Sequence, residues 1–166
     1  VGGPPGVSNA AYEKLDHRRR RNGSYYIKGH LLNGYLGGTG LDFRNLTPLS
    51  RAGNGNHERD VERKVIEKID QGKTVEYIVT PVYGSRSFPT DVQITSSTLD
   101  TQQRARLGDV ISAENLVPLG VECVANVLNE TSGQYDTSIV HETVTNPVES
   151  TVSSYEIQPK LKNAVS

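Results

Sequence analysis

His30 is the side chain best suited to act as a general base, because it ends a β-like run in the sequence Lys28-Gly29-His30. An unperturbed imidazole has a pKa of about 6.5, so the neutral ring can take a proton from water near neutral pH. A glycine-rich loop and an asparagine-rich turn follow, and a helix start that carries Asn54 can place an amide oxygen beside this base. Such a layout is suited to metal-assisted attack of water on a phosphodiester.

These motifs resemble those of a known nuclease family. The order Lys-Gly-His, Asn-Leu-Thr-Pro, Asn and then Glu, over roughly residues 24–83, is similar to the DNA/RNA non-specific endonucleases of the ββα-metal (His-Me finger) class. More narrowly, the stretch from GHLLNGYLGGTG to GKTVEYIVTPVY is similar to nuclease domains at the C-termini of bacterial polymorphic and injected toxins. The resemblance implies that His30 activates the water that attacks phosphorus.

Asn54 matches the metal-binding asparagine of this family. One neutral amide oxygen suits Mg²⁺, because this ion keeps several of its waters, and phosphate oxygens of the substrate would complete its shell. Another divalent cation such as Mn²⁺ is left open. Asn56 is the alternative in a neighbouring register, and Asn45 is predicted to bind substrate or to orient the loop by hydrogen bonds.

Glu62 matches the acidic residue that follows the family's asparagine by eight positions. On a straight α-helix this spacing gives about 12 Å of rise and about 80° of rotation. We therefore expect Glu62 to hold metal-bound waters or a neighbouring side chain rather than the metal itself. Glu58, about 6 Å along the helix from Asn54, is the alternative, and His57 is a secondary candidate for the base.

Lys28 stands where the family usually has arginine, in an Asp-Arg-Gly-His pattern, and Ile27 replaces the aspartate. A lysine can still stabilise the negative charge of a pentacovalent phosphorane, but it lacks the bidentate fork of arginine. Lys28 is therefore retained as a catalytic candidate. Asn33, three residues after His30, is expected to support the loop.

The charge distribution says more than the net charge, which is −1 over 166 residues. Basic side chains gather in residues 1–30, and we predict that four successive arginines near the end of a short helix contact phosphates: Arg18, Arg19, Arg20 and Arg21. A solvated run is the alternative. Cys123 is the only cysteine, so neither an intrachain disulfide nor a cysteine-based metal site is possible.

Local patterns predict an α+β fold in which an antiparallel sheet packs against a helix that begins near residue 54. In this helix Val61, Val65 and Ile69 recur every fourth residue, and apolar and polar residues alternate over 73–84. We expect a linker and basic segment over residues 1–22, a nuclease domain over 23–150 and a C-terminal tail over 151–166. The ββα element would comprise strands 24–30 and 42–48 and this helix, which Gly72 would end. Further strands are predicted at 73–84, 90–95, 120–128 and 138–145, and 105–115 is ambiguous.

We predict a metal-dependent endonuclease that hydrolyses DNA and/or RNA with little sequence preference. The absence of methionine suggests a piece of a longer protein, and the toxin-type run suggests a secreted or injected bacterial effector that acts in the cytoplasm or nucleus of a target cell. Expected partners are nucleic acid, a carrier or secretion apparatus and an immunity protein, but no membrane. The alternative is a non-catalytic binding module; a zinc hydrolase or deaminase is disfavoured because its His and Cys motifs are missing.

Overall fold

The computed structural model describes residues 8–21, 23–85, 99–150, 152 and 156–157, so the strand predicted at 90–95 lies outside the described residues. Its helices are α1 (Asn9–Leu15), α2 (Arg51–His57), α3 (Arg63–Asp70) and α5 (Thr101–Glu114), with short 3₁₀ turns η1 (Gly34–Leu36) and η2 (Phe43–Asn45) and a π-helical segment η3 (Glu58–Glu62). Its strands are β1 (Arg19–Arg20), β2 (Gly23–Ser24), β3 (Tyr26–His30), β4 (Leu46–Ser50), β5 (Val75–Val82), β6 (Gly120–Asn129) and β7 (Gln134–Thr145).

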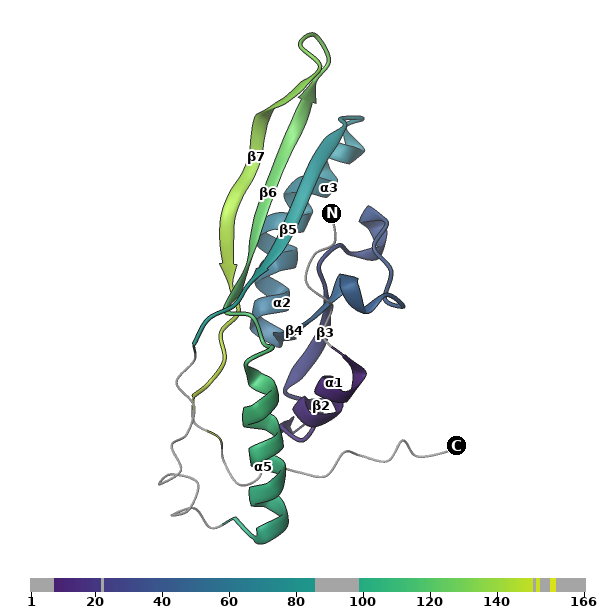
Figure 1. Ribbon diagram of the computed structural model, residues 1–166. Coiled ribbons are helices and arrows are strands. Elements are labelled where there is room, and N and C mark those ends of the chain that lie inside the picture. The colour runs from purple at the N-terminus through teal and green to yellow at the C-terminus, as the bar shows by residue number, and fades with distance from the viewer. Residues whose placement is uncertain (1–7, 22, 86–98, 151, 153–155, 158–166) are drawn as a thin grey trace.

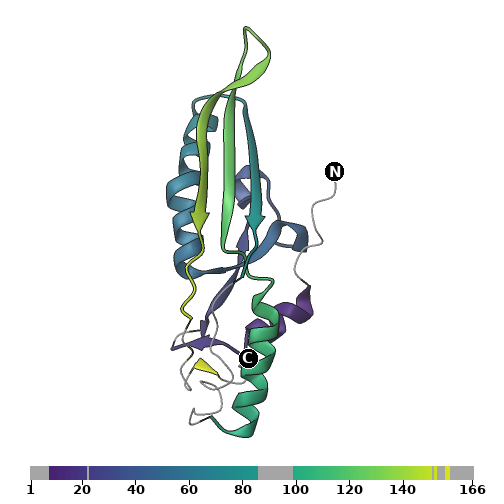
Figure 2. The same cartoon turned by 60° about the vertical axis from the view of Figure 1, so that its left-hand side comes forward.

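The largest sheet is antiparallel, in the order β5-β6-β7. One face of this sheet is covered by the continuous helix α2–η3–α3, and the β6–β7 hairpin extends beyond the end of the helix (Figures 1 and 2). The strand predictions at 73–84, 120–128 and 138–145 are confirmed. Helices occur together with small antiparallel sheets, which agrees with the predicted α+β class.

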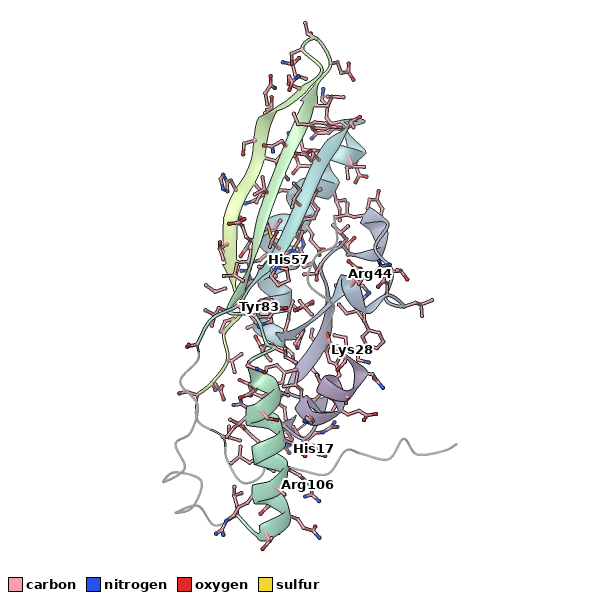
Figure 3. All side chains as sticks on the ribbon, in the orientation of Figure 1. His17, Lys28, Arg44, His57, Tyr83 and Arg106 are labelled. Atoms are coloured by element: carbon pink, nitrogen blue, oxygen red, sulfur yellow. The ribbon has the colours of Figure 1, made fainter. Side chains whose placement is uncertain are left out.

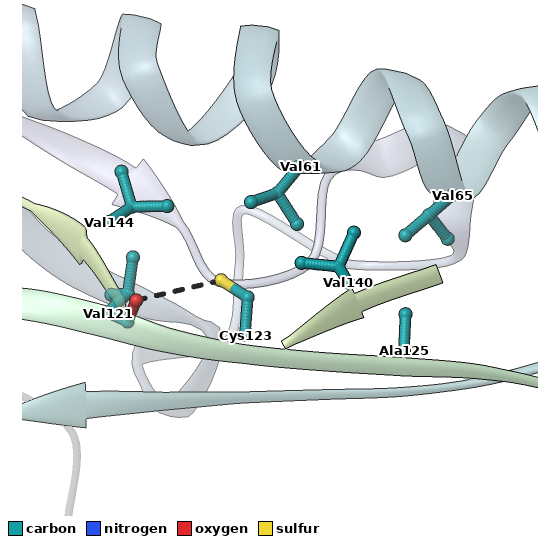
Figure 4. Packing of buried hydrophobic residues seen from close by; sticks show 7 residues of the cluster. All are labelled: Val61, Val65, Val121, Cys123, Ala125, Val140 and Val144. Atoms are coloured by element: carbon teal, nitrogen blue, oxygen red, sulfur yellow. Dashed lines mark hydrogen bonds between the residues drawn. The ribbon is translucent and has the colours of Figure 1, made fainter. Parts of the chain in front are cut away.

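The core between this helix and the sheet is built from small apolar side chains (Figure 4). Val61 and Val65 are fully buried against Val121, Val140 and Val144, as the spacing of four predicted, whereas Ile69 is 38% exposed. These contacts orient the helix against the sheet. Asn54 lies in the first turn of the same helix.

The helix ends where the sequence predicted. Gly72 has φ +77°, and its N–H donates to the Ile69 carbonyl at 2.8 Å while Lys73 N–H donates to the Lys68 carbonyl at 3.0 Å. This pair of bonds is a Schellman motif, which glycine accommodates without strain.

The predicted order of two strands and a helix is present, with shifted boundaries. β3 and β4 form a separate antiparallel pair, with Tyr26 opposite Ser50 and His30 opposite Leu46. β4 starts later than predicted because Asp42 caps the η2 turn by accepting from Arg44 N–H. The helix starts at Arg51, earlier than predicted, because Ser50 is its N-cap.

Residues 8–21, the described part of the segment predicted as linker and basic region, contribute to the folded body. Helix α1 ends at Leu15, and Ala11, Tyr12 and Leu15 are buried. The ambiguous stretch 105–115 is part of α5, which begins with a capping box at Asp100. No helix in the part of the chain that the structure describes is both long and apolar enough to cross a membrane.

Candidate nuclease site

The end of β3 is shaped by Gly29, which lies next to His30. A Cβ at this position would stand 2.5 Å from Leu49 Cδ1 and 3.3 Å from Asn54 Oδ1. The first distance means that Leu49 would have to shift to admit a side chain here, and the second places the amide oxygen of Asn54 over the face of β3 to which Gly29 turns. Helix α2 thus brings Asn54 to the end of β3 that carries His30, while the His30 side chain leaves the strand on the alternate face, with Lys28.

The imidazole of His30 is half-buried under the glycine-rich loop. A Cβ at Gly40 would stand 3.0 Å from His30 Nε2. The loop thus approaches the ring near Nε2 through a residue without a side chain.

Asn45 holds this loop in shape. Its side-chain oxygen accepts from Leu32 N–H at 2.9 Å, and its NH₂ group donates to the carbonyls of Leu32 at 2.8 Å and Thr39 at 3.1 Å. The prediction that Asn45 orients the loop is confirmed. Substrate binding by Asn45 stays a prediction, and in the structure its amide bonds to the loop's own backbone. Gly38 is required there, since its Cβ would clash with the Leu32 carbonyl oxygen at 1.8 Å.

The start of α2 is fixed by a residue that the sequence analysis missed. Asn146, buried just after β7, accepts through Oδ1 from Ser50 N–H at 2.8 Å and from the Ser50 hydroxyl at 3.1 Å. Its NH₂ group donates to the Pro118 carbonyl at 2.9 Å. Ser50 in turn caps the helix by accepting from Gly53 N–H. Asn146 therefore ties the helix start that carries Asn54 to the three-stranded sheet, and a lone asparagine after a strand offers no sequence signal for this.

Glu62 faces inward rather than toward solvent. It is 5% exposed, its Oε1 has no hydrogen-bond partner, and burial raises the pKa of its carboxyl, although hydrogen bonding with Asn33 lowers that pKa in part. Asn33 also caps η1 by accepting from Leu36 N–H, so the expectation that it supports the loop is confirmed. Glu62 is thereby connected to the loop that covers His30.

The π-helical segment changes the expected direction of Glu62. A π turn closes its bonds at i→i+5, so it takes up about one residue more than an α turn and sets the following residues back by about 100°. Glu62 then lies about 20° from Asn54 around the helix axis instead of about 80°. The predicted rotation is corrected, while the separation of about two turns remains.

The raised pKa of Glu62 gives a testable link between the site and stability. A carboxyl whose pKa is higher in the folded than in the unfolded state contributes stability below the unfolded value, and this contribution is lost as pH rises through the folded value. Glu62→Gln carries no charge at any pH, so it should be more stable than the wild type at pH 7, by about 1 kcal/mol, and equal to it near pH 4. Urea unfolding across this pH range measures the difference. Glu76→Gln, at an exposed position on β5, is the control; an unchanged pH slope for Glu62→Gln would contradict the prediction.

Lys28 is held by aromatic rings instead of by an acid. Its Nζ lies 5.0 Å from the centroid of Tyr12 and 5.4 Å from that of Phe43. Lys28 and Arg44 both lie on the side of the molecule away from the three-stranded sheet (Figure 3). Because side chains alternate along a strand, Lys28 shares its face of β3 with His30.

The prediction that Arg18 contacts phosphate is wrong, because Arg18 is fully buried. Its guanidinium donates to Glu114 at 3.0 Å, to Glu156 at 3.3 Å and to the Glu149 carbonyl at 2.9 Å, and it covers the Tyr25 ring at 3.8 Å. The other three predicted contacts differ from it. Arg19 lies in β1 and donates to Ser24, while Arg20 and Arg21 are exposed.

His57 is not available as a base. The ring is 1% exposed between the helix and the sheet, and its Nε2 lies 2.9 Å from the Tyr77 hydroxyl. Burial lowers the pKa of this imidazole. The secondary candidate is therefore a neutral core residue (Figure 3).

Within the described residues, no group of three or more His, Cys, Asp or Glu side chains is placed to hold a metal ion. The oxygen donor at the end of β3 is the neutral amide of Asn54, which is half-buried. Asn56 differs, since its Oδ1 accepts from Arg59 at 3.0 Å. This donor fits a hard cation that retains most of its water, as Mg²⁺ does.

Comparison with known proteins places the chain in a family. The family model described as DNA/RNA non-specific endonuclease matches residues 8–99, which is more than half of the 166 residues. No curated protein matches the chain. The matched span contains His30, Asn54 and Glu62. The chain belongs to the DNA/RNA non-specific endonuclease family.

Proposed function

We propose that this nuclease-family protein is a divalent-metal-dependent endonuclease that hydrolyses DNA and/or RNA with little sequence preference. The observation that supports this most directly is the match of residues 8–99, which include His30 and Asn54, to the DNA/RNA non-specific endonuclease family. A base on a strand end and an amide oxygen on the following helix start would make β3, β4 and α2 a ββα-metal element.

In this mechanism His30, a half-buried imidazole at the end of β3, takes the proton from the attacking water. Lys28, on the same face of β3, stabilises the negative charge that develops on the phosphoryl oxygens. Asn54 would hold the cation, which when bound polarises a phosphoryl oxygen. Glu62 acts through the loop and through waters, because it is about two helical turns from Asn54.

The choice between two asparagines is testable. Asn54→Ala should raise the Mg²⁺ concentration needed for half-maximal cleavage by about tenfold or more, because it removes the proposed ligand. Asn56→Ala should leave it unchanged, since Asn56 pairs with Arg59. Mn²⁺ binding followed by electron paramagnetic resonance gives a second readout that does not depend on cleavage. A stronger effect at Asn56 than at Asn54 would show that the register is wrong.

We further propose that the protein is the toxic effector domain of a larger bacterial protein, delivered by a secretion or injection apparatus. The toxin-type run that begins at Gly29 supports this role. A nuclease with weak base preference would attack the nucleic acid of its producer, so an immunity protein is proposed as a partner. Acidic residues on it would match the basic surface of Lys28, Arg20 and Arg21.

A further inference from the structure

The loop between β3 and β4 exposes apolar side chains beside the proposed active site. Leu41 is 93% exposed and Phe43 is 37% exposed, and both follow Gly40, where a Cβ would stand 3.0 Å from His30 Nε2. Single exposed apolar residues are common on protein surfaces. Here two exposed apolar residues lie close together in sequence, on the loop beside the proposed site. We therefore attribute their exposure to substrate contact rather than to chance.

The ring of Phe43 is held from behind. Its centroid lies 6.2 Å from that of Tyr12 with the planes tilted by 40°, and Tyr12 itself is only 4% exposed. The ammonium of Lys28 approaches both rings, at 5.4 Å and 5.0 Å. Phe43 is thus a fixed aromatic surface with a positive charge next to it, a combination that suits a base and its phosphate.

This surface is close to the reacting end of β3. The Phe43 carbonyl accepts from Leu46 N–H, and Leu46 is the strand partner of His30. Lys28 and His30 are two residues apart on one face of β3, a separation of about 7 Å. The ring therefore lies about one nucleotide from the proposed site of cleavage.

We propose that Phe43, supported by Tyr12 and Lys28, stacks on a nucleobase adjacent to the scissile phosphate, and that single-stranded or locally unpaired nucleic acid is the preferred substrate. This rests on the proposed endonuclease function. In a duplex the faces of each base are covered by its neighbours, so an aromatic side chain reaches them only after unstacking. Stacking tolerates any sequence because every base has a π face, in keeping with weak base preference.

Binding by non-cleaving protein tests the contact directly. In a His30→Ala background, Phe43→Ala should weaken binding of a single-stranded oligonucleotide about 5- to 100-fold, the range expected for loss of one stacked base. Phe43→Leu, which keeps apolar volume without a flat ring, should behave like Phe43→Ala, and Phe43→Trp should bind as well as Phe43 or better. Tyr135→Ala, an exposed aromatic on β7, is the matched control and should change nothing. Circular dichroism verifies that each variant is folded.

An abasic scan identifies the base concerned. Removing the base next to the cleavage position should weaken binding to the protein with Phe43 by about the same factor as Phe43→Ala does. The same abasic oligonucleotide should bind the Phe43→Ala protein no more weakly than the intact oligonucleotide does. In His30-containing enzyme, Phe43→Ala should raise KM for single strands more than for duplex. Equal losses on both substrates, or additive effects of the mutation and the abasic site, would overturn the inference while leaving the endonuclease proposal intact. If the wild type cleaves no nucleic acid, the proposed function fails, and the binding assays still decide the role of Phe43.

Discussion

His30→Ala should lower the rate of nucleic-acid cleavage about 10²–10⁴-fold without unfolding the protein, because a general base is worth about this much. The change removes the side chain that lies against Gly40 and leaves the β3–β4 pairing in place. Plasmid DNA and total RNA, each with Mg²⁺ or EDTA, are the substrates for the measurement. His141→Ala, at an exposed position on β7, is the matched control and should retain full activity.

The same variant tests the proposed biological role. Inducible expression of the wild type should reduce viability and degrade cellular nucleic acid, whereas expression of His30→Ala should be tolerated. Undiminished cleavage by a folded His30→Ala protein would refute the assignment of the base. Equal toxicity of the two proteins would refute the effector role and leave the enzymatic assignment to the cleavage assay.

Arg18→Met should destabilise the fold by about 3–5 kcal/mol, because removing one partner of a buried ion pair leaves the other charges uncompensated. Here Glu114 and Glu156 would lose the same guanidinium, and the carbonyl of Glu149 would lose a donor. Urea unfolding followed by circular dichroism measures the loss.

Two further variants separate burial from substrate contact. Arg18→Met combined with Glu114→Gln should recover part of the lost stability, because one buried charge is then removed with its partner. Arg21→Met, at an exposed position in the same arginine run, should stay within about 0.5 kcal/mol of the wild type. A stable Arg18→Met protein with weakened nucleic-acid binding would restore the phosphate-contact role that its burial contradicts.

Features set by short-range patterns were predictable from the sequence. The spacing of Val61 and Val65 identified the buried helix face, Gly72 identified the helix end, and alternation in 73–84 identified β5. The order of the site motifs likewise led to the family that the chain belongs to. For the helix face, the helix end and β5, the information lies within a few turns or one strand of the residue concerned.

Features set by distant partners were not predictable. Arg18 is buried because it meets Glu114 and Glu156, which are 96 and 138 positions away, so four identical neighbours in sequence have different environments. The N-cap of α2 depends on Asn146. The π-helical segment that redirects Glu62 has no recognised signal in the sequence, so straight-helix arithmetic misplaced the side chain around the helix axis.

The bond between Ser50 and Asn146 also sets the order in which the enzyme can mature during synthesis. The two residues are 96 positions apart, and a ribosome makes the N-terminal part of a chain first. The helix start that carries Asn54 is complete in sequence long before its anchor has been translated. A nascent chain can therefore pair β3 with β4 early, but its nuclease centre gains its final support only when the end of β7 has emerged.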